Sequence, residues 1–443
     1  MSAVTQASPS SAVTDDMVVQ VTGGRPLAGR ITVQGSKNIA LHLYAAASLV
    51  DAPVTLLGAP AILDTDVCAR LLTHTGAQVT VMGGQFTVAP AEWVRPVIHP
   101  QLGRRVRTTC VLAAAVLARC GQVSFPQPGG DAFCARLIDR HLAAMEAAGA
   151  VVSSDETGMF AQCGPGGVRP FAVDVGTPYG PSLGATVTAL LLAARAPGTS
   201  LITSPSIEPE ATETAAFLAD RGVCVHWDAA GLHVTGGARI AGGTFVVAGD
   251  RIEAATMIMA AAATGGSIRL GGITTAGLPD GLTAALADAG VHLADTPGGE
   301  VHMALAGPLR AVEAATGPHP GLPTDTAPQL AAMLTQAHGA SQITERIYPQ
   351  RDTHLHGLTA FGAAVSSRGP AVLVHGASRL RAAQVEASDI RAVTALLLAG
   401  LVAEGTSTIR GMYHLRRGYG HLLSNLATLG ADITTIPEAR PCP

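Results

Sequence analysis

One unit recurs six times along this chain: a helix-like run that ends in glycine, then a small or branched residue, then an alternating strand. The six glycines are Gly76, Gly149, Gly222, Gly290, Gly362 and Gly430, separated by 73, 73, 68, 72 and 68 residues. Each glycine fits the first position after a helix, where a left-handed backbone turns the chain into a strand. Each copy therefore predicts an α/β module, and six modules predict either one closed ring or two groups of three.

The stretch 242–249, Gly-Gly-Thr-Phe-Val-Val-Ala-Gly, lies between the third and fourth copies, and we interpret it as a crossing between domains. Hydrophobic residues make up 48% of the chain, which is enough for large cores. Because only 3% of the residues are aromatic, those cores must consist of closely packed Ala, Val, Leu and Ile. Helices that end in glycine are ordinary in an α/β protein, but the regular spacing favours a true repeat.

Charge and cysteine patterns exclude several function classes. The formal net charge is −4 and no basic stretch alternates with aromatic residues, which argues against nucleic acid and leaves small acidic substrates open. The seven cysteines show no metal-ligand spacing, and we expect free thiols in a reducing compartment and no metal or cofactor. Residues 1–16 lack a cationic segment, so we expect a disordered tail and not a signal peptide. No apolar stretch approaches the length of a membrane span, so we expect a cytoplasmic protein.

Lys37 is the only lysine, against 27 arginines, and it lies in the turn Gln34-Gly35-Ser36-Lys37-Asn38. A chain that uses arginine almost everywhere should keep a lysine where a compact ammonium charge is needed. We therefore expect an anion, phosphate or carboxylate, at Lys37. The alternative is that compositional drift left one lysine by chance.

Two further polar segments stand inside apolar sequence. Arg104, Arg105 and Arg107 precede an apolar helix-like run, where cations oppose the helix dipole and need a negative partner or solvent. The segment 128–139 has a glycine pair followed by Asp131, which is either a helix cap or an acid. Cys134, three residues on, has no matched base, and we interpret it as a packed thiol.

The proline-rich loop 318–325 presents Asp325 before a helix-like run, again as a cap or a functional acid. Arg351, Asp389 with Arg391, and Arg417 occur in polar loops of the C-terminal half. Any one of these arginines could be a surface ion pair of little energetic value. Together with Lys37 they exceed what structure alone needs, and paired arginine donors suit carboxylate and phosphate.

These segments carry a family likeness, and further motifs extend it over nearly everything after residue 17. The motifs are Gly35-Ser36-Lys37-Asn38, residues 128–141, residues 182–186, Glu208-Pro209-Glu210, residues 250–253, Pro323-Thr324-Asp325, residues 388–391 and Arg417-Gly418-Tyr419. The chain resembles the enolpyruvyl transferases, and within them most closely the UDP-N-acetylglucosamine 1-carboxyvinyltransferases. Asn38 supports that choice, since the shikimate-pathway relatives usually have serine there.

The resemblance implies an α/β fold of two lobes, the inside-out α/β barrel of EPSP synthase, with three βαβαββ units around a pseudo-threefold axis in each lobe. It implies that residues 17–36 and 249–443 form the second lobe and residues 37–248 the first, after the tail 1–16. Six repeats are then two groups of three.

The resemblance also implies the substrates and the residues that bind them. Phosphoenolpyruvate would lie between the lobes, and its binding set is Lys37, Arg136, Arg351, Asp389, Arg391 and Arg417, of which Lys37, Arg136 and Arg417 surround the phosphate. The nucleotide sugar would contact Asn38, Arg107, Arg136, Leu137, Ile138, Asp139, Ser182, Gly184, Asp325 and the backbone of Ile347. The implied catalytic residues are Lys37, Asp131, Asp325 and Arg417, with Asp325 as the general base on the acceptor hydroxyl. No metal, cofactor, nucleic acid or membrane is implied, and the oligomeric state stays open.

The first departure from the family pattern is Asp131, which stands where relatives usually have a cysteine. A carboxylic acid can still deliver a proton, particularly if burial raises its pKa. It cannot form the thioether by which the epoxide fosfomycin inactivates the cysteine enzymes, so we expect insensitivity to fosfomycin. Whether Asp131 donates a proton or caps a helix stays open.

The second departure lies in the acceptor pocket. The usual lysine before the Ser-Val-Gly turn is replaced by Gly180 or a neighbour, and Ile138 follows Leu137 where the family has Pro-Val. Two alternatives to the cell-wall enzyme therefore stand. One is a specialised-metabolism relative that transfers enolpyruvyl to another uridine nucleotide, such as UMP in nikkomycin or polyoxin-type pathways. The other is a nucleotide-sugar-binding protein without turnover.

Overall fold

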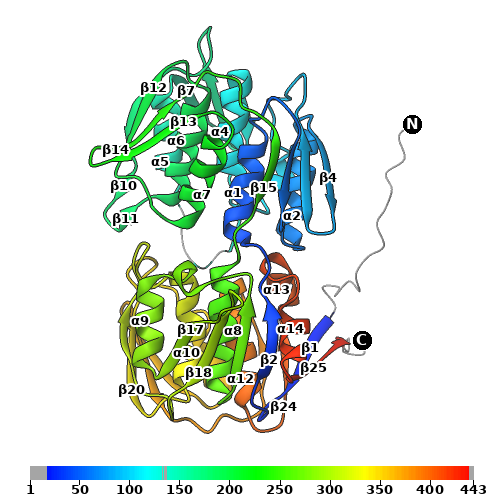
Figure 1. Cartoon of the computed structure of the whole chain (residues 1–443), viewed down its shortest axis with the longest axis vertical. Helices are drawn as coiled ribbons and strands as arrows, with labels where there is room; N and C mark the ends of the chain where they lie inside the picture. The colour runs from blue at the N-terminus through cyan, green and yellow to red at the C-terminus, as the bar shows by residue number, and fades with distance from the viewer. Residues whose placement is uncertain (1–16, 132, 134–136, 439–443) are drawn as a thin grey trace.

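The computed structural model describes residues 17–131, 133 and 137–438, arranged as two lobes joined by two crossing segments (Figure 1). One hydrophobic core draws on residues between 39 and 247, and a second core draws on 19–33 and 254–429. The chain thus begins in the second lobe, crosses to the first at 33–36 and returns at 247–250. The predicted lobe boundaries, 36/37 and 248/249, lie in these two segments. That each lobe folds as a unit within these limits stays a prediction. The predicted tail 1–16 lies outside the described residues.

The first lobe contains three sheets and a short hairpin. Its strands are β3 (Val54–Leu57), β4 (Gln78–Met82), β5 (Gln85–Ala89) and β15 (Gly243–Val246); β6 (Gln122–Phe125), β7 (Ala150–Ser154) and β8 (Met159–Cys163); β9 (Ala172–Asp174), β12 (Thr199–Thr203), β13 (Cys224–Asp228) and β14 (Gly231–Thr235); and the hairpin β10 (Gly176–Thr177) with β11 (Gly180–Pro181). Its helices are α1 (Lys37–Ala47), α2 (Leu63–His74), α3 (Pro100–Gly103), α4 (Thr109–Cys120), α5 (Asp139–Ala147), α6 (Leu183–Arg195) and α7 (Pro209–Ala219).

The second lobe repeats this plan with three four-stranded sheets. Its strands are β2 (Ala28–Thr32), β16 (Ser267–Gly271), β17 (Val291–Asp295) and β18 (Val301–Leu305); β19 (Glu313–Ala315), β20 (Gly339–Thr344), β21 (Ala364–Arg368) and β22 (Ala371–Gly376); and β1 (Met17–Thr22), β23 (Gln384–Glu386), β24 (Thr406–Arg410) and β25 (Asp432–Pro437). Its helices are α8 (Arg251–Ala263), α9 (Asp280–Asp288), α10 (Ala327–Leu334), α11 (Leu355–Ala360), α12 (Ile390–Val402), α13 (Met412–Gly418) and α14 (Leu422–Thr428), with 3-10 turns η1 (Thr275–Gly277) and η2 (Thr324–Thr326).

The six repeat glycines end six helices as the sequence predicts. Their φ angles are 110° at Gly76, 97° at Gly149, 93° at Gly222, 91° at Gly290, 88° at Gly362 and 98° at Gly430. They follow α2, α5, α7, α9, α11 and α14, and each precedes a strand. The first five of these strands begin a hairpin, whereas the last, β25, pairs with β1. This confirms the left-handed glycine that joins helix to strand, since side chains with a Cβ rarely adopt such angles.

The sheets share one topology, in which an edge strand runs parallel to its neighbour and the remaining pairs are antiparallel. The sheet β6-β8-β7 has no separate edge strand, and the single bridge between Val97 and Ser124 takes that place. In the last unit β1, from the N-terminal end, lies between β24 and β25, so that Val21 pairs with both Ser407 and Ile433. The N-terminal strand therefore completes the C-terminal module.

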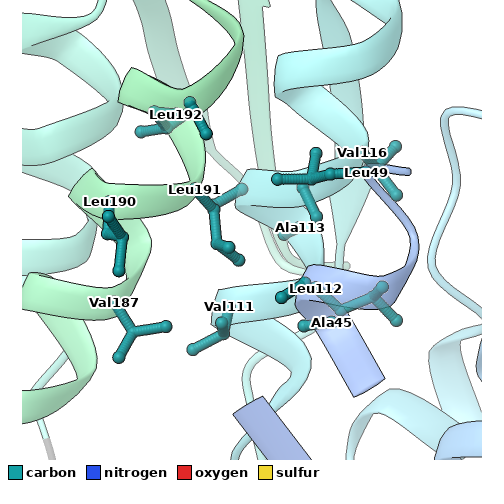
Figure 2. Close-up of a cluster of buried hydrophobic side chains, with 14 of the residues drawn as sticks. Ala45, Leu49, Val111, Leu112, Ala113, Val116, Val187, Leu190, Leu191 and Leu192 are labelled. Atoms are coloured by element: carbon teal, nitrogen blue, oxygen red, sulfur yellow. The ribbon is translucent and has the colours of Figure 1, made fainter. Parts of the chain in front are cut away.

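Each lobe buries helices that are apolar around most of their surface, as expected for helices enclosed by sheets and other helices. In the first lobe Figure 2 shows side chains of α4 and α6, such as Val111 and Leu191, packed with Ala45 of α1 and Leu49 just after it. In the second lobe α8, α10 and α12 are almost wholly buried. The abundance of alanine in these helices is what allows them to approach closely.

The two crossing segments run antiparallel and hydrogen-bond to each other. Ser36 N donates to Ala248 O at 2.7 Å, and Asp250 N donates to Gln34 O at 2.9 Å. A Cβ on Gly35 would lie 1.9 Å from the carbonyl oxygen of Gly58, so only glycine fits there. The crossing thus fixes where α1 and α8 begin.

Candidate active site

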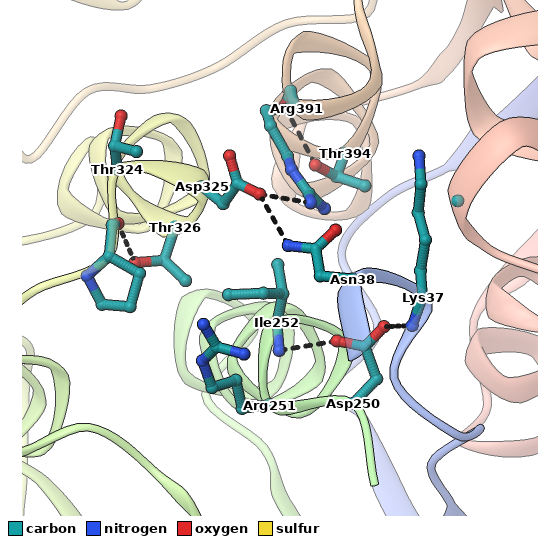
Figure 3. A network of polar contacts seen from close by, with 12 residues as sticks. Lys37, Asn38, Asp250, Arg251, Ile252, Thr324, Asp325, Thr326, Arg391 and Thr394 are labelled. Carbon is teal, nitrogen blue, oxygen red and sulfur yellow. Dashed lines mark hydrogen bonds and ion pairs between the residues drawn. The ribbon is translucent and has the colours of Figure 1, made fainter. Parts of the chain in front are cut away.

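The starts of α1 and α8 meet at the crossing and share one cap, Asp250. Its Oδ1 accepts from the backbone N–H groups of Ile252 and Glu253 at 2.9 and 3.2 Å, and its Oδ2 accepts from the backbone N–H of Lys37 at 3.1 Å (Figure 3). Ser36 caps α1 as well, accepting from the N–H of Ile39 at 3.4 Å. Two helix N-termini from different lobes therefore converge, which makes the surroundings electropositive.

The ammonium group of Lys37 meets an acid that the sequence analysis did not select. Lys37 Nζ lies 3.1 Å from Oδ2 of Asp64, in the first turn of α2. Arg417, on α13 of the second lobe, donates to the same carboxylate from Nε at 3.1 Å and from Nη2 at 3.3 Å. The three side chains are only 11%, 4% and 8% exposed for Lys37, Asp64 and Arg417. Asp64 thus holds two predicted phosphate-binding cations together across the lobes.

Asp131 pairs with the remaining amino group of the same arginine. Its Oδ1 lies 2.5 Å from Arg417 Nη1, and its side chain is 9% exposed. Burial alone would raise the pKa of Asp131, but His414, Arg417 and Lys37 outweigh it and hold the pKa well below its ordinary range. The sequence-based condition that burial raises this pKa is therefore wrong for the unliganded site, because cations from distant parts of the chain surround the carboxylate. Asp131 lies in irregular chain ahead of α5, whose N-cap is Ile138, and whether it caps a helix stays a prediction.

Asp325 joins the other two predicted cations. Its Oδ2 lies 2.6 Å from Arg391 Nη2 and its Oδ1 lies 2.9 Å from Arg351 Nη1. Asn38, from the first lobe, donates to Oδ2 at 3.4 Å (Figure 3). Burial would raise the pKa of Asp325, but Arg391 and Arg351 dominate and hold the pKa far below its usual range. Tyr419 accepts a 2.7 Å hydrogen bond from the other amino group of Arg391 and fixes its orientation.

Asp389 caps the helix that carries Arg391. Its Oδ1 caps α12 through the N–H groups of Arg391 and Ala392 at 2.8 and 2.9 Å, and its Oδ2 accepts from Thr353 Oγ1. Both oxygens are thus engaged, and the residue is 1% exposed. A contact with phosphoenolpyruvate stays a prediction, and in this structure Asp389 acts by positioning the start of the helix that carries Arg391.

The predicted nucleotide-sugar residues of the first lobe gather around the starts of α5 and α6. Arg107 Nη2 donates to the carbonyl oxygen of Leu137 at 2.7 Å. Leu137 is highly exposed, whereas Ile138 is buried and Asp139 begins α5. Arg136, which is common to both predicted substrate sets, lies outside the described residues, as does Cys134.

Ser182 and Gly184 belong to the same region. Ser182 caps α6 by accepting from the N–H of Ala185 at 3.4 Å. A Cβ on Gly184 would lie 2.6 Å from the ring of His141, so the glycine lets this buried histidine pack against the helix. Burial, followed by the charges of Arg107 and His42, lowers the pKa of His141 to about 3, so the ring is neutral. In the second lobe Ile347 donates its backbone N–H to Glu345 Oε1 at 2.9 Å.

Sequence reasoning did not assign a role to the ion cluster of Glu208, Glu210 and Arg251, although their motifs were noted. Arg251 begins α8, and it donates to Glu210 twice at 3.1 Å and to Glu208 at 2.9 Å. Glu208 also accepts from the N–H of His319 at 2.9 Å. The cluster joins the first lobe to two segments of the second. The sequence feature that could have indicated it is the pair of glutamates in Glu208-Pro209-Glu210.

The described residues include no group of three or more His, Cys, Asp or Glu side chains placed to hold a metal ion. Within the same ranges, none of the helices is long and apolar enough to cross a membrane.

Known proteins resemble this chain over nearly its whole length. The model of the family EPSP synthase (3-phosphoshikimate 1-carboxyvinyltransferase) matches residues 21–426. Proteins named UDP-N-acetylglucosamine 1-carboxyvinyltransferase from Novosphingobium aromaticivorans and Caulobacter vibrioides are 36% and 37% identical over 430 and 425 residues. Each alignment covers 94% of this chain and 98% or 97% of the relative.

Solved structures show the same fold. The enolpyruvyl transferase NikO from Streptomyces tendae superposes with a TM-score of 0.83 at 25% identity, covering 95% of this chain and 98% of that one. EPSP synthase from Acinetobacter baumannii superposes with a TM-score of 0.74 at 17% identity, covering 95% and 100%. The two-lobed α/β fold that the family resemblance implies is therefore confirmed. The chain is a transferase that belongs to the EPSP synthase family of enolpyruvyl transferases.

Proposed function

We propose that this protein transfers the enolpyruvyl group of phosphoenolpyruvate to the 3′-hydroxyl of UDP-N-acetylglucosamine and releases phosphate, in the synthesis of peptidoglycan precursors. The observation that carries the proposal is the set of four buried cations between the lobes, Lys37 and Arg417 on Asp64, and Arg351 and Arg391 on Asp325. Two separate cation pairs suit a small substrate with two anionic groups. The relatives named for this reaction support the choice of substrates.

In this proposal the donor phosphate binds at Lys37 and Arg417, together with Arg136. The donor carboxylate binds at Arg351 and Arg391. These positions need little reorganisation, because Asp64 and Tyr419 already fix the guanidinium groups. Preorganised cations stabilise the charge carried through the reaction more than mobile ones would.

The chemistry proposed is addition followed by elimination. A protonated Asp131 gives its proton to C3 of phosphoenolpyruvate while the acceptor hydroxyl attacks C2 and loses its proton to Asp325. In the tetrahedral adduct the phosphate and the carboxylate share one carbon. One proton of C3 then returns to the ionised Asp131, and the double bond re-forms as the bond from C2 to the phosphate oxygen breaks. Asp325 is a weak base while both arginines hold it, and it becomes stronger when the donor carboxylate shares them.

The acceptor is proposed to lie along the starts of α5 and α6. Asn38 and Asp325 would hold the reacting sugar, and Arg107, Leu137–Asp139, Ser182, Gly184 and Ile347 would surround the nucleotide. Two of these side chains are already held by the backbone, Arg107 by the carbonyl of Leu137 and Ser182 by the N–H of Ala185. We also propose a cytoplasmic location, which the free thiols at Cys68, Cys110, Cys120, Cys163 and Cys224 favour.

A second candidate acceptor is favoured by one observation, the similarity to NikO at a TM-score of 0.83. That acceptor is another uridine nucleotide such as UMP, consistent with Gly180 or a neighbour in place of the lysine that the family usually has there. Phosphate release should be measured with phosphoenolpyruvate and UDP-N-acetylglucosamine, with phosphoenolpyruvate and UMP, and with no acceptor. Release only with UDP-N-acetylglucosamine supports the first proposal, and release only with UMP supports the second. No release in any mixture, with binding of the nucleotide sugar retained, favours a binding protein without turnover.

A further inference from the structure

The contact between Asp131 and Arg417 differs from the neighbouring ion pair that uses the same guanidinium. Arg417 gives Nε and Nη2 to Asp64, which is fixed on helix α2 and also holds Lys37. It gives Nη1 to Asp131, which follows the left-handed Gly130 in irregular chain. Asp64 is thus held by both Lys37 and Arg417. Asp131 accepts a hydrogen bond from Arg417 Nη1.

We propose that Asp131 is an internal counter-ion of Arg417, that the phosphate group of the donor substrate displaces it, and that the displaced carboxylate then takes up a proton from solvent. The inference rests on the proposed function for one point, the assignment of Arg417 to the donor phosphate. The ion pair between Asp131 and Arg417 is exchanged for one between phosphate and Arg417. The bond formed on Asp131 is one O–H bond, and the proton comes from water or buffer.

The charges around Asp131 give the reason for the exchange. Arg417 and His414 face it from α13, Lys37 from α1 and Arg391 from α12, while Asp64 holds the other edge of the guanidinium. His414 Nδ1 lies 3.9 Å from Oδ1 of Asp131, so a protonated ring would act through its charge. The cations hold Asp131 ionised, with a lowered pKa, when no other anion is present.

A bound phosphate group reverses this balance. It carries close to two negative charges and would neutralise Lys37 and Arg417, the same groups that stabilise the carboxylate. A carboxyl group that stays buried beside an anion favours its neutral form, both because of desolvation and because of like-charge repulsion. Binding of the donor would therefore protonate Asp131, the acid that then protonates the donor. Asp131 would pair with Arg417 until the phosphate replaces it, and would afterwards be the proton source.

The test uses sulfate, a tetrahedral dianion that does not titrate near neutral pH, with the full chain and calorimetry at pH 6, 7 and 8 in two buffers of different ionisation enthalpy. Wild-type protein should take up a proton fraction that approaches one, so that sulfate affinity rises as the pH falls, by at most about tenfold per pH unit. Asp131→Asn should bind sulfate at least about tenfold more tightly at pH 8, because the competing anion is gone. The difference in pH dependence between wild type and Asp131→Asn reports on Asp131.

Glu156→Gln is the matched control, since it removes one exposed negative charge from the same lobe and should bind sulfate like wild type. Equal affinity and equal proton uptake in wild type and Asp131→Asn would overturn the inference. Sulfate binding that Arg417→Met leaves unchanged would also overturn it, because the anion would then bind elsewhere. If Asp131→Asn does not fold, sulfate binding by the wild-type protein without proton uptake still overturns the inference. The proposed function is judged separately by phosphate release with each acceptor, so either can fail without the other.

Discussion

Replacing Arg251 by methionine should destabilise the protein strongly, and more at high pH than at low pH. Arg251 is 6% exposed and makes three hydrogen bonds to Glu208 and Glu210, of which Glu210 is 1% exposed. Removing one partner of a buried ion pair costs about 3–5 kcal/mol, because an uncompensated charge stays behind. Here two carboxylates stay behind on the first lobe, so we expect a loss of about 3–5 kcal/mol in the free energy of unfolding at pH 8.

The pH dependence follows from the pKa values of the two glutamates. Burial and Glu210 raise the pKa of Glu208, and burial would also raise that of Glu210, but Arg251 outweighs it and lowers the pKa. Without Arg251 both values rise above those of the unfolded chain, so the folded state binds more protons. Stability then falls as the pH rises through the folded-state pKa values and recovers toward pH 5. Neutralising both acids as well, in Arg251→Met with Glu208→Gln and Glu210→Gln, should restore most of the loss.

The assay is urea unfolding at pH 5 and pH 8, followed by tryptophan fluorescence and by circular dichroism. Both tryptophans, Trp93 and Trp227, lie in the first lobe, whereas circular dichroism reports on both lobes. The two transitions should separate in Arg251→Met, because a tie between the lobes is lost. Arg379→Met is the control, since its 2.7 Å pair with Glu404 is exposed, and its free energy of unfolding should stay close to that of the wild-type protein. A loss below about 1 kcal/mol at pH 8, or the same loss at both pH values, would refute the reasoning.

Further predictions concern the site and the crossing. Lys37→Arg should lower kcat/KM by about a hundredfold with an unchanged circular dichroism spectrum, because a planar guanidinium cannot replace the ammonium beside Asp64; full activity would contradict a role for Lys37. Fosfomycin should not inactivate the wild-type protein with time, whereas Asp131→Cys should become sensitive, and Cys134→Ala should keep most of the wild-type turnover. The pKa of Glu253 is raised to about 8 by burial and by Asp250, so folded protein holds a proton there and wild-type stability should fall by up to about 1.4 kcal/mol per pH unit between pH 5 and 8. Urea titrations should show that Glu253→Gln loses this dependence, and parallel pH profiles would refute it.

The repeated modules could be predicted from the sequence because a single residue decides each one. A glycine with positive φ after a helix is a local backbone requirement, and all six are found. The pairing of β1 with both β24 and β25 could not be predicted, because the strand pattern of residues 17–22 fits any sheet edge equally well. Which sheet a strand completes depends on how the lobe closes, a property of the whole chain.

The residues of the site also divide into those that the sequence indicates and those that only the fold reveals. Lys37, Asp325 and Arg417 could be selected from composition and motifs, but Asp64 could not. An acid in the first turn of a helix ordinarily stabilises the helix dipole, and nothing local to Asp64 indicates more. Only the fold brings it against Lys37 and Arg417, and only the fold shows that cations, not burial, control the pKa of Asp131.

The charge balance of the described site bears on how a donor can bind at all. Four cations, Lys37, Arg351, Arg391 and Arg417, face three carboxylates, Asp64, Asp131 and Asp325, so the unliganded site has a net charge near plus one. Phosphoenolpyruvate would add about three negative charges, two of them on its phosphate group. Keeping every carboxylate ionised would then leave a buried excess of about two negative charges on this set, or about one when Arg136 also binds the phosphate as proposed, and desolvation makes either excess costly. Asp64 and Asp325 are each in direct contact with two cations, whereas the direct ion pair of Asp131 uses the amino group of Arg417 that the phosphate would occupy. Asp131 is therefore the carboxylate most easily neutralised, and donor binding should strengthen as the pH falls.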